Sequence, residues 1–474
     1  MTEDKSYYFC GIGGSGMLPL AMIVKAAGAR VAGSDRALDQ GRLSDKFKWL
    51  EARGIALFDQ DGSGLVDSRQ ILVASAAIED TVPDIQRANL LGCRRMTRAE
   101  LLAEHFNAVV RNIAVGGTSG KSTVTGMIGW ILTEAKLDPT IMNGAVMKNF
   151  ADADAPFASS RVGQSDVMVS EVDESDGSIA LFNPRVAVLN NVSLDHKSLE
   201  ELRMLFGDFV SKATHAIWNL DDPESRTLFA ARRVTASSSF GFSDGADFQA
   251  VQVQEQPLSS RFTLRRQGED YPVSLQVPGR HNIANALAAI AASCAIGVPV
   301  DIATAAIGSY LGLARRFDIV GSANGVTVID DFGHNPDKIS ATLRTLRAFP
   351  GRVIAFFQPH GFGPIQKMGT ELAAVFSECL DGDDRVLICD PVYFGGTVDR
   401  SLGSESVVDA INAGGGNAIF LPEREACGTR MAELARPGDR IVVMGARDDT
   451  LQGFAKSILA NIAARSPTLS VTRT

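Results

Sequence analysis

The chain has 474 residues, of which 45% are apolar and 21% charged, so it is globular and too long for one core; about two to four domains are expected. The net charge of −9 argues against a nucleic-acid or membrane-surface binder, so an anionic ligand must be held by local glycine loops and a few cations. Six scattered cysteines without a Cys-x-x-Cys pair, and no apolar signal segment, predict a cytoplasmic protein.

The first motif is a strand that runs into Gly-x-Gly-x-x-Gly, formed by Gly11, Gly13 and Gly16. A helix is predicted to follow, and then a second strand that ends in Asp35. This spacing is the one at which a dinucleotide site holds a ribose. Taken alone, the motif favours an NAD(P) oxidoreductase, although the same turn serves any nucleotide diphosphate. A first α/β domain is predicted to close near Asn107.

The second motif is a glycine loop at 116–123, placed between an apolar strand and a helix-like stretch. Its backbone N–H groups and the helix N-terminus are suited to phosphates. Lys121 adds a point charge, and the Ser122 hydroxyl can ligate Mg²⁺. The loop is tighter than the usual P-loop, because valine stands at 115 where that pattern has glycine. The alternative is a glycine turn that merely ends a strand.

The next strand ends in four carboxylates, which are Glu171, Asp173, Glu174 and Asp176. A strand of this kind beside a phosphate loop is where Mg²⁺ is usually anchored, because a hard cation needs oxygen ligands next to the triphosphate. The alternative is a solvated acidic loop. The following strand ends in Asp-His, so His196 is either a metal ligand or substrate-facing group, or a structural histidine.

Further along, an alanine-rich helix carries Asn282 and Asn285 on one face, where an amide can read a base edge or cap the helix. From about residue 312, strands alternate with helices, which predicts another doubly wound α/β domain. At its start, Arg315 and Arg316 are either a solvated pair or cations that swing in when a hinge closes.

Together these motifs resemble the Mur ligase family over essentially the whole chain. The matching segments are 11–17, 33–35, 98–100, 117–123, 171–176, 195–196, 279–285, 315–317 and 330–336. The resemblance implies three α/β domains: a Rossmann-like UDP-sugar-binding domain (1–107), a central P-loop ATP-binding domain (108–312), and a Rossmann-like domain for the amine substrate and nucleotide closure (313–474). The first domain is most similar to that of members that act on UDP-N-acetylmuramate with L-alanine, so its glycine turn is expected to bind a UDP-sugar and not NAD.

The resemblance also implies the chemistry of peptidoglycan precursor synthesis. With ATP and Mg²⁺, the carboxylate of UDP-N-acetylmuramate is phosphorylated, and an amino acid or peptide amine attacks the acyl phosphate to form an amide. The implied catalytic residues are Lys121, Glu171, His196 and Arg316, and the implied Mg²⁺ ligands are Ser122, Glu171 and His196. The implied ATP contacts are Gly117, Thr118, Ser119, Gly120, Lys121, Ser122, Thr123, Asn282, Asn285, Arg316, Asp331, His334 and Asn335. The implied UDP-sugar contacts are Gly11, Gly13, Gly14, Ser15, Gly16, Ser34 and Asp35.

One departure from the family pattern concerns the amine. Two arginines that usually go with the motif at 358–364 are missing, which leaves His360 and Lys367 as candidates for the amine pocket. The segment 366–369 looks closer to the relative that attaches a tripeptide during wall recycling. Lys212 lies near the position of a lysine that many relatives carbamylate, and it is not assigned. A regulator that has lost turnover is the alternative from another class. The chain is expected to be a monomer or homodimer.

Overall fold

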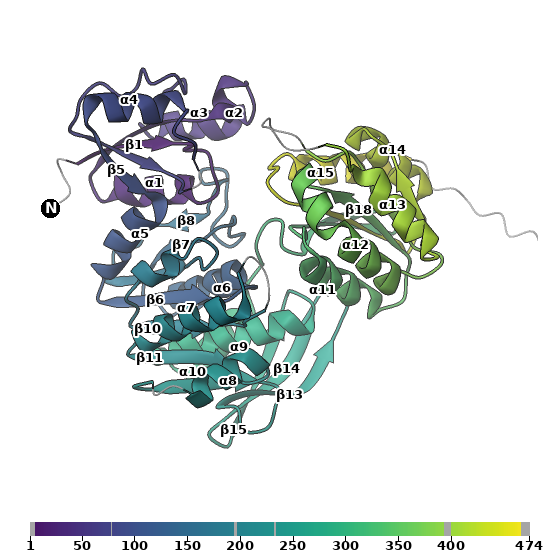
Figure 1. Cartoon of the computed structure of the whole chain (residues 1–474). Helices are drawn as coiled ribbons and strands as arrows, with labels where there is room; N and C mark the ends of the chain where they lie inside the picture. The colour runs from purple at the N-terminus through teal and green to yellow at the C-terminus, as the bar shows by residue number, and fades with distance from the viewer. Residues whose placement is uncertain (1–4, 77, 194–196, 232–233, 393–399, 466–474) are drawn as a thin grey trace, which may run out of the picture. The chain divides into compact units, whose positions relative to one another are not determined.

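The computed structural model of the chain describes residues 5–76, 78–193, 197–231, 234–392 and 400–465. Figure 1 shows three sheets with their helices. The chain divides into two compact units, one made of 1–255 with 259–312 and the other of 313–474 with 256–258. The predicted boundary after residue 312 coincides with this division, whereas the predicted boundary after 107 falls inside unit one. Within the described ranges, no helix is both long and apolar enough to cross a membrane.

Unit one begins with a five-stranded parallel sheet in the order β3-β2-β1-β4-β5. The side chains of β1 alternate between two cores, so that Tyr7 and Phe9 pack with α1 and α5 while Tyr8 and Cys10 pack with α4. This doubly wound arrangement confirms the predicted α/β class. The elements are β1 Ser6–Cys10, α1 Met17–Ala26, β2 Arg30–Ser34, α2 Arg36–Asp39, α3 Ser44–Ala52, β3 Ala56–Phe58, β4 Gln70–Ala74, α4 Pro83–Leu91, β5 Arg94–Thr97 and α5 Arg98–Asn107.

The second sheet of unit one has ten strands in the order β15-β14-β13-β12-β11-β10-β6-β9-β7-β8. β6 lies near its middle and is buried from Asn112 to Gly116, as expected for a strand covered on both faces. The elements are β6 Arg111–Gly116, α6 Lys121–Glu134, β7 Thr140–Met142, β8 Ser160–Arg161, β9 Val167–Glu171, η1 Ser178–Leu181, β10 Val186–Leu189, α7 Leu199–Ser211, β11 His215–Asn219, α8 Pro223–Ala231, β12 Ser237–Gly241, β13 Phe248–Glu255, β14 Ser260–Arg266, β15 Glu269–Leu275, α9 Arg280–Ala295 and α10 Val300–Ile307.

The two sheets of unit one are joined through α5 and η1. Phe106 of α5 meets Phe182, which follows η1, edge to face at a ring distance of 5.4 Å. The Asn107 side chain donates to the Leu181 carbonyl at 2.9 Å and accepts from the Asn183 N–H at 2.8 Å. One continuous core therefore contains side chains from both sheets, which is why they form a single compact unit.

All three tryptophans of the chain lie in unit one. Trp49 of α3 donates to the Asp154 carbonyl at 2.8 Å and carries the Arg53 guanidinium 3.9 Å above its ring. Trp130 of α6 donates to the Ala306 carbonyl at 3.1 Å. Trp218 of β11 stacks on the ring of Phe229 at 4.7 Å.

Unit two has one six-stranded sheet in the order β16-β17-β21-β18-β19-β20, parallel except for β16. Helices α11, α12 and α13 supply the core on one face, and α14 and α15 supply it on the other. The elements are β16 Asp318–Ala323, β17 Val326–Asp331, α11 Pro336–Arg347, β18 Val353–Gln358, α12 Phe362–Cys379, β19 Arg385–Ile388, α13 Ser404–Ala413, β20 Ala418–Phe420, α14 Arg424–Leu434, β21 Arg440–Gly445 and α15 Leu451–Ala464.

Candidate active site

The glycine loop predicted at 116–123 joins the end of β6 to the start of α6. Gly120 is the N-cap of α6 and takes the left-handed conformation, with φ of 79°. Within the described chain, the backbone N–H groups of Gly120, Lys121 and Ser122 find no acceptor. Three free donors at a helix N-terminus suit an anion, and the role of this loop as a phosphate site stays a prediction.

Lys121 is held by two groups beside these donors. Its ammonium donates to the Gly117 carbonyl at 2.8 Å and pairs with the Glu174 carboxylate at 2.7 Å. The Glu174 side chain is only 5% exposed. Burial raises the pKa of its carboxyl, against the lowering effect of the Lys121 charge. Glu174, one of the four acids at the end of the strand, is thus the counter-ion of Lys121.

The predicted magnesium ligands Ser122 and Glu171 lie side by side. Glu171 ends β9, which pairs with β6, and its Oε2 accepts the Ser122 hydroxyl at 2.6 Å. An ideal Cβ on Gly144 would stand 2.1 Å from Glu171 Oε1, so any side chain at 144 would displace that carboxylate. A hydroxyl and a carboxylate side by side fit Mg²⁺, which takes few protein ligands and completes its shell with phosphate oxygens and water. The third predicted ligand, His196, lies outside the described residues.

Two asparagines after β10, Asn190 and Asn191, brace the loop. Asn191 Oδ1 accepts the backbone N–H of Ser119 and the hydroxyl of Thr118, both at 2.9 Å. Asn190 donates to the Ser119 carbonyl at 3.0 Å and to Asn285 Oδ1 at 2.9 Å. The signal for them was present, since both follow a buried strand beside the phosphate-loop strand.

The predicted base-contacting pair, Asn282 and Asn285, is buried within α9. Asn285 reaches the phosphate loop through Asn190, and Asn282 donates to the Pro278 carbonyl at 2.7 Å. Gly279 is the N-cap of α9 and no side chain caps this helix, so the capping explanation of Asn282 is wrong.

The first glycine turn, at 11–16, leads into α1, whose N-cap is Gly16. Asp35 braces the turn, because its Oδ2 accepts the Gly13 N–H and its Oδ1 accepts the Ala37 N–H, both at 2.8 Å. Ser34 is buried and its hydroxyl donates to Asp84. In the described chain, the N–H groups of Ser15 and Gly16 find no acceptor, so this turn too offers donors to an anion.

A cavity of about 50 Å³ lies where the first turn of α5 faces Lys121 and the end of β9. It is lined by Arg98, Ala99, Leu102, Lys121, Glu171, Val172, Asp173, Ser178 and Phe182. Burial alone would raise the pKa of Asp173, but Lys121, the hydrogen bonds from Ser175 and the charge of Arg98 outweigh it and lower that pKa. Arg98 belongs to a segment that the sequence analysis matched to the family without giving the arginine a role.

In unit two, Asp331 ends β17 and organises the loop that follows. Its Oδ1 accepts the Gly333 N–H at 2.8 Å and the Thr342 hydroxyl at 2.9 Å, and its Oδ2 accepts the Phe317 N–H at 2.8 Å. Asn335 caps α11 by accepting the Lys338 N–H at 3.0 Å. The Arg316 guanidinium lies 4.6 Å from the Phe332 ring centre.

The predicted amine-pocket residue His360 meets His334 edge to face, with ring centres 5.2 Å apart. Burial, followed by the charge of Lys338, lowers the pKa of His334 to about 3, so its imidazole is neutral at neutral pH. The other predicted pocket residue, Lys367, lies exposed on α12. The lysine left unassigned, Lys212, ends α7 with its ammonium on the Ala180 carbonyl.

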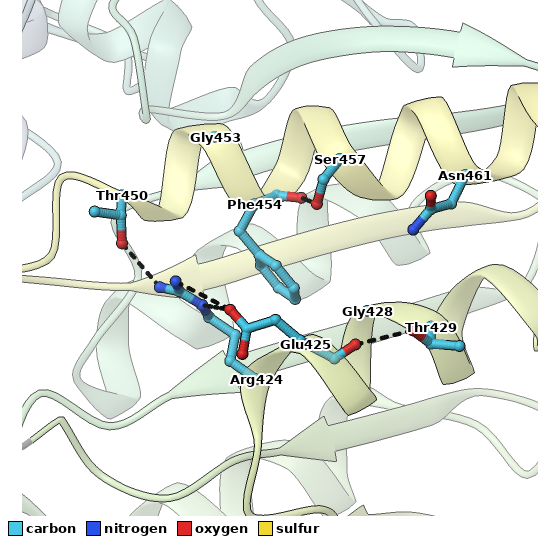
Figure 2. A pocket seen from close by; sticks show the side chains of 9 residues that line it. All are labelled: Arg424, Glu425, Gly428, Thr429, Thr450, Gly453, Phe454, Ser457 and Asn461. Carbon is cyan, nitrogen blue, oxygen red and sulfur yellow. Dashed lines mark hydrogen bonds and ion pairs between the residues drawn. The ribbon is translucent and has the colours of Figure 1, made fainter. Parts of the chain in front are cut away.

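A second hollow, of about 390 Å³, lies between α14 and α15 (Figure 2). Arg424 at its edge is already held by Asp448 at 3.0 Å and Thr450 at 2.9 Å. The hollow contains none of the predicted site residues.

Comparison with known proteins finds three family models along the chain. The Mur ligase family catalytic domain matches residues 6–109, the Mur ligase middle domain 115–293, and the Mur ligase glutamate ligase domain 315–447.

Among curated proteins, the UDP-N-acetylmuramate–L-alanine ligases of Jannaschia sp. and Agrobacterium fabrum are each 34% identical to the chain. The first alignment covers 98% of this chain and 96% of that protein, and the second covers 97% and 98%. Among solved structures, the UDP-N-acetylmuramate-alanine ligase of Thermotoga maritima has the same fold, with a TM-score of 0.78 at 23% identity over 96% of this chain and 98% of that one. A murein peptide ligase from Psychrobacter arcticus matches with a TM-score of 0.72 at 25% identity, over 98% of this chain and 99% of that one.

Proposed function

Since the chain belongs to the Mur ligase family, whose members are ATP-dependent amide-forming ligases of peptidoglycan precursor synthesis, we propose that it joins the carboxylate of UDP-N-acetylmuramate to an amine. The observation that carries the proposal is the convergence of Lys121, Ser122 and Glu171 at the ends of the adjacent strands β6 and β9. The dehydrogenase reading of the first glycine motif is set aside, because the family uses this turn for a UDP-sugar.

The reaction starts from an unreactive carboxylate, which has to gain a leaving group. A carboxylate oxygen attacks the γ-phosphorus of ATP, and the bond to the ADP oxygen breaks to give an acyl phosphate. The free N–H groups at the start of α6 and the ammonium of Lys121 face the phosphates and stabilise the charge of the moving phosphoryl group. The amine nitrogen then attacks the acyl carbon, the tetrahedral intermediate expels phosphate, and a proton leaves the nitrogen.

Mg²⁺ would be held by Ser122 and Glu171, with His196 as the third proposed ligand, and it would neutralise charge on the β- and γ-phosphates. The supporting arrangement is the contact of the Ser122 hydroxyl with the Glu171 carboxylate, which packs where only a glycine at 144 leaves it room. The hydroxyl of Ser122 would turn from Glu171 toward the cation.

The residues proposed for unit two are Arg316, Asp331, His334 and Asn335 at the nucleotide, and His360 at the amine. The rings of His360 and His334 meet, and Arg316 and His334 both contact Phe332, so three of these side chains gather around Phe332. The proposed amine is bulkier than L-alanine, because the first turn of α12 has no cation to hold the carboxylate of a free amino acid. The proposed location is the cytoplasm, in keeping with six free cysteines, of which five are buried.

The proposal is tested at Lys121. Lys121→Ala removes the charge on the phosphates, and ligation of UDP-N-acetylmuramate to any accepted amine should fall at least about a hundredfold, whereas the affinity for the nucleotide sugar should not change. The measurements are amide formation by mass analysis and sugar binding by calorimetry. Lys48→Ala, a change to an exposed lysine on α3, is the control and should leave both unaltered. Ligation by Lys121→Ala above about a tenth of the parent rate would refute the assignment.

A further inference from the structure

Arg98 is a cation that packs against the first glycine turn and lines a cavity shared with Lys121 of the phosphate-loop helix. It is the first residue of α5, and its place is fixed by a capping box in which the Thr97 hydroxyl accepts the Glu100 N–H at 3.1 Å and Glu100 accepts the Thr97 N–H at 2.7 Å. Its side chain runs across Gly16, where an ideal Cβ would stand 2.9 Å from Arg98 Cδ and 3.2 Å from Nε. It also lines the cavity that contains Lys121 and Glu171.

The guanidinium of Arg98 is half-buried, and within the described residues it makes no hydrogen bond or ion pair. Its charge helps to lower the pKa of Asp173, which lines the same cavity. An arginine held in this way keeps its planar set of donors available, and that set matches a carboxylate or a phosphate with two parallel hydrogen bonds.

We propose that Arg98 binds the reacting carboxylate of the nucleotide-sugar substrate and presents it to the phosphate loop. This rests on the proposed function. The carboxylate has to lie where the sugar held at the first turn reaches the phosphate held at Lys121. Arg98 packs on that turn and lines a cavity with Lys121, so it stands on the path between them. About 50 Å³ corresponds to roughly three or four water-sized positions, which suits a carboxylate group.

The other oxyanion of the same substrate, the UDP diphosphate, is expected instead at the free N–H groups of Ser15 and Gly16. A diphosphate does not have to approach Lys121 or Glu171, whereas Arg98 shares a cavity with both. We therefore expect the N–H groups of Ser15 and Gly16 to bind the diphosphate and Arg98 to bind the carboxylate.

The test compares two ligands by titration calorimetry: UDP-N-acetylmuramate, and UDP-N-acetylglucosamine, which has the same nucleotide and diphosphate but lacks the carboxylate. In Arg98→Gln the affinity for UDP-N-acetylmuramate should fall about 10- to 100-fold, while the affinity for UDP-N-acetylglucosamine should stay within about twofold. Arg98→Lys should lie between, because it keeps the charge and loses the planar donors. The control is Arg94→Gln on an exposed arginine of β5, which should change neither.

Equal losses for both ligands would place Arg98 at the diphosphate and overturn the proposal, and unchanged affinities for both would make its role structural and overturn it too. If the parent protein bound UDP-N-acetylmuramate no better than UDP-N-acetylglucosamine, the proposed function itself would fall, whatever the variants show. Thermal unfolding of each variant checks that it is folded. If Arg98→Gln does not fold, the affinities of Arg98→Lys for the two nucleotide sugars decide between the outcomes.

Discussion

Asp330 is a carboxyl whose environment opposes ionisation. It precedes Asp331, the last residue of β17, and has no side-chain exposure, and neither of its oxygens accepts a hydrogen bond within the described residues. Arg315 Nε stands 3.5 Å from its Oδ2. Burial raises the pKa of Asp330 to about 7, with Asp331 and Asp318 adding to the rise and Arg315 opposing it.

This raised pKa links the stability of unit two to pH. Between pH of about 4 and 7 the folded protein keeps a proton that the unfolded chain has released, so the contribution of Asp330 is full at low pH and is lost as pH rises through about 7. Asp330→Asn cannot lose a proton. We therefore expect the stability of the variant relative to the parent to rise from about pH 6 to pH 8, by on the order of 1–3 kcal/mol in free energy of unfolding. Calorimetric unfolding temperatures of the two proteins at each pH measure this difference. A difference between the two proteins that does not vary with pH would show that Asp330 has an ordinary pKa.

Among single residues, those with a recognisable chemical role were predictable from the sequence, whereas the residues that contact them in the fold were not. Lys121, Ser122 and Glu171 were named from the sequence because a glycine loop and an acidic strand end have recognisable patterns. Glu174 was seen only as one of several acids, because which carboxylate reaches Lys121 depends on how the chain turns after β9. Gly144 carries no pattern at all, since its importance comes from the Glu171 oxygen that packs against it.

At the scale of elements, α5 has two functions. Its first turn positions Arg98, and its last turn packs Phe106 against Phe182 in the second sheet. Alternating strands and helices predicted the last α/β domain, the family resemblance implied three such domains, and the glycines predicted the phosphate-loop helix. The sequence did not predict that the first two sheets share a core, because the hydrophobic pattern of α5 says which face is buried but not against what.

Removal of the Phe106 ring should loosen this junction. Both Phe106 and Phe182 are almost fully buried, so Phe106→Ala should lower the free energy of unfolding of unit one by about 3–5 kcal/mol. The measurement is thermal and urea unfolding, with Leu90→Ala, at a leucine that is 78% exposed, as the matched control. The control should stay within about 0.5 kcal/mol of the parent. A Phe106→Ala protein that unfolds together with the parent would mean that α5 is held by its other contacts.

At the scale of the whole molecule, the open question is which amine unit two accepts. Gly361 has φ of 144°, a region that favours glycine, so an arginine in the family position would be strained there. The first turn of α12 continues with Gly363 and Pro364 and has no cation. A free amino acid is best held by a fixed cation on its carboxylate, so a pocket without one suits a larger or less anionic amine.

We therefore predict that L-alanine is a poor substrate with a high KM, and that a bulkier amino acid or a peptide is preferred. Steady-state kinetics with UDP-N-acetylmuramate, ATP and a panel of amines decides the matter. The curated relatives named L-alanine ligases make the opposite outcome easy to recognise: ligation of L-alanine at low concentration, more efficient than any peptide tested, would show that the missing arginines do not matter.

The positions of the tryptophans determine which part of the protein intrinsic fluorescence reports on. Trp49, Trp130 and Trp218 all belong to unit one, and Trp130 stands on the helix that opens at the phosphate loop. Intrinsic fluorescence excited at the indole band therefore follows unit one alone. Unit two has no tryptophan of its own to report its unfolding or the titration of Asp330. A single tryptophan introduced into unit two would let fluorescence follow the unfolding of that unit as well.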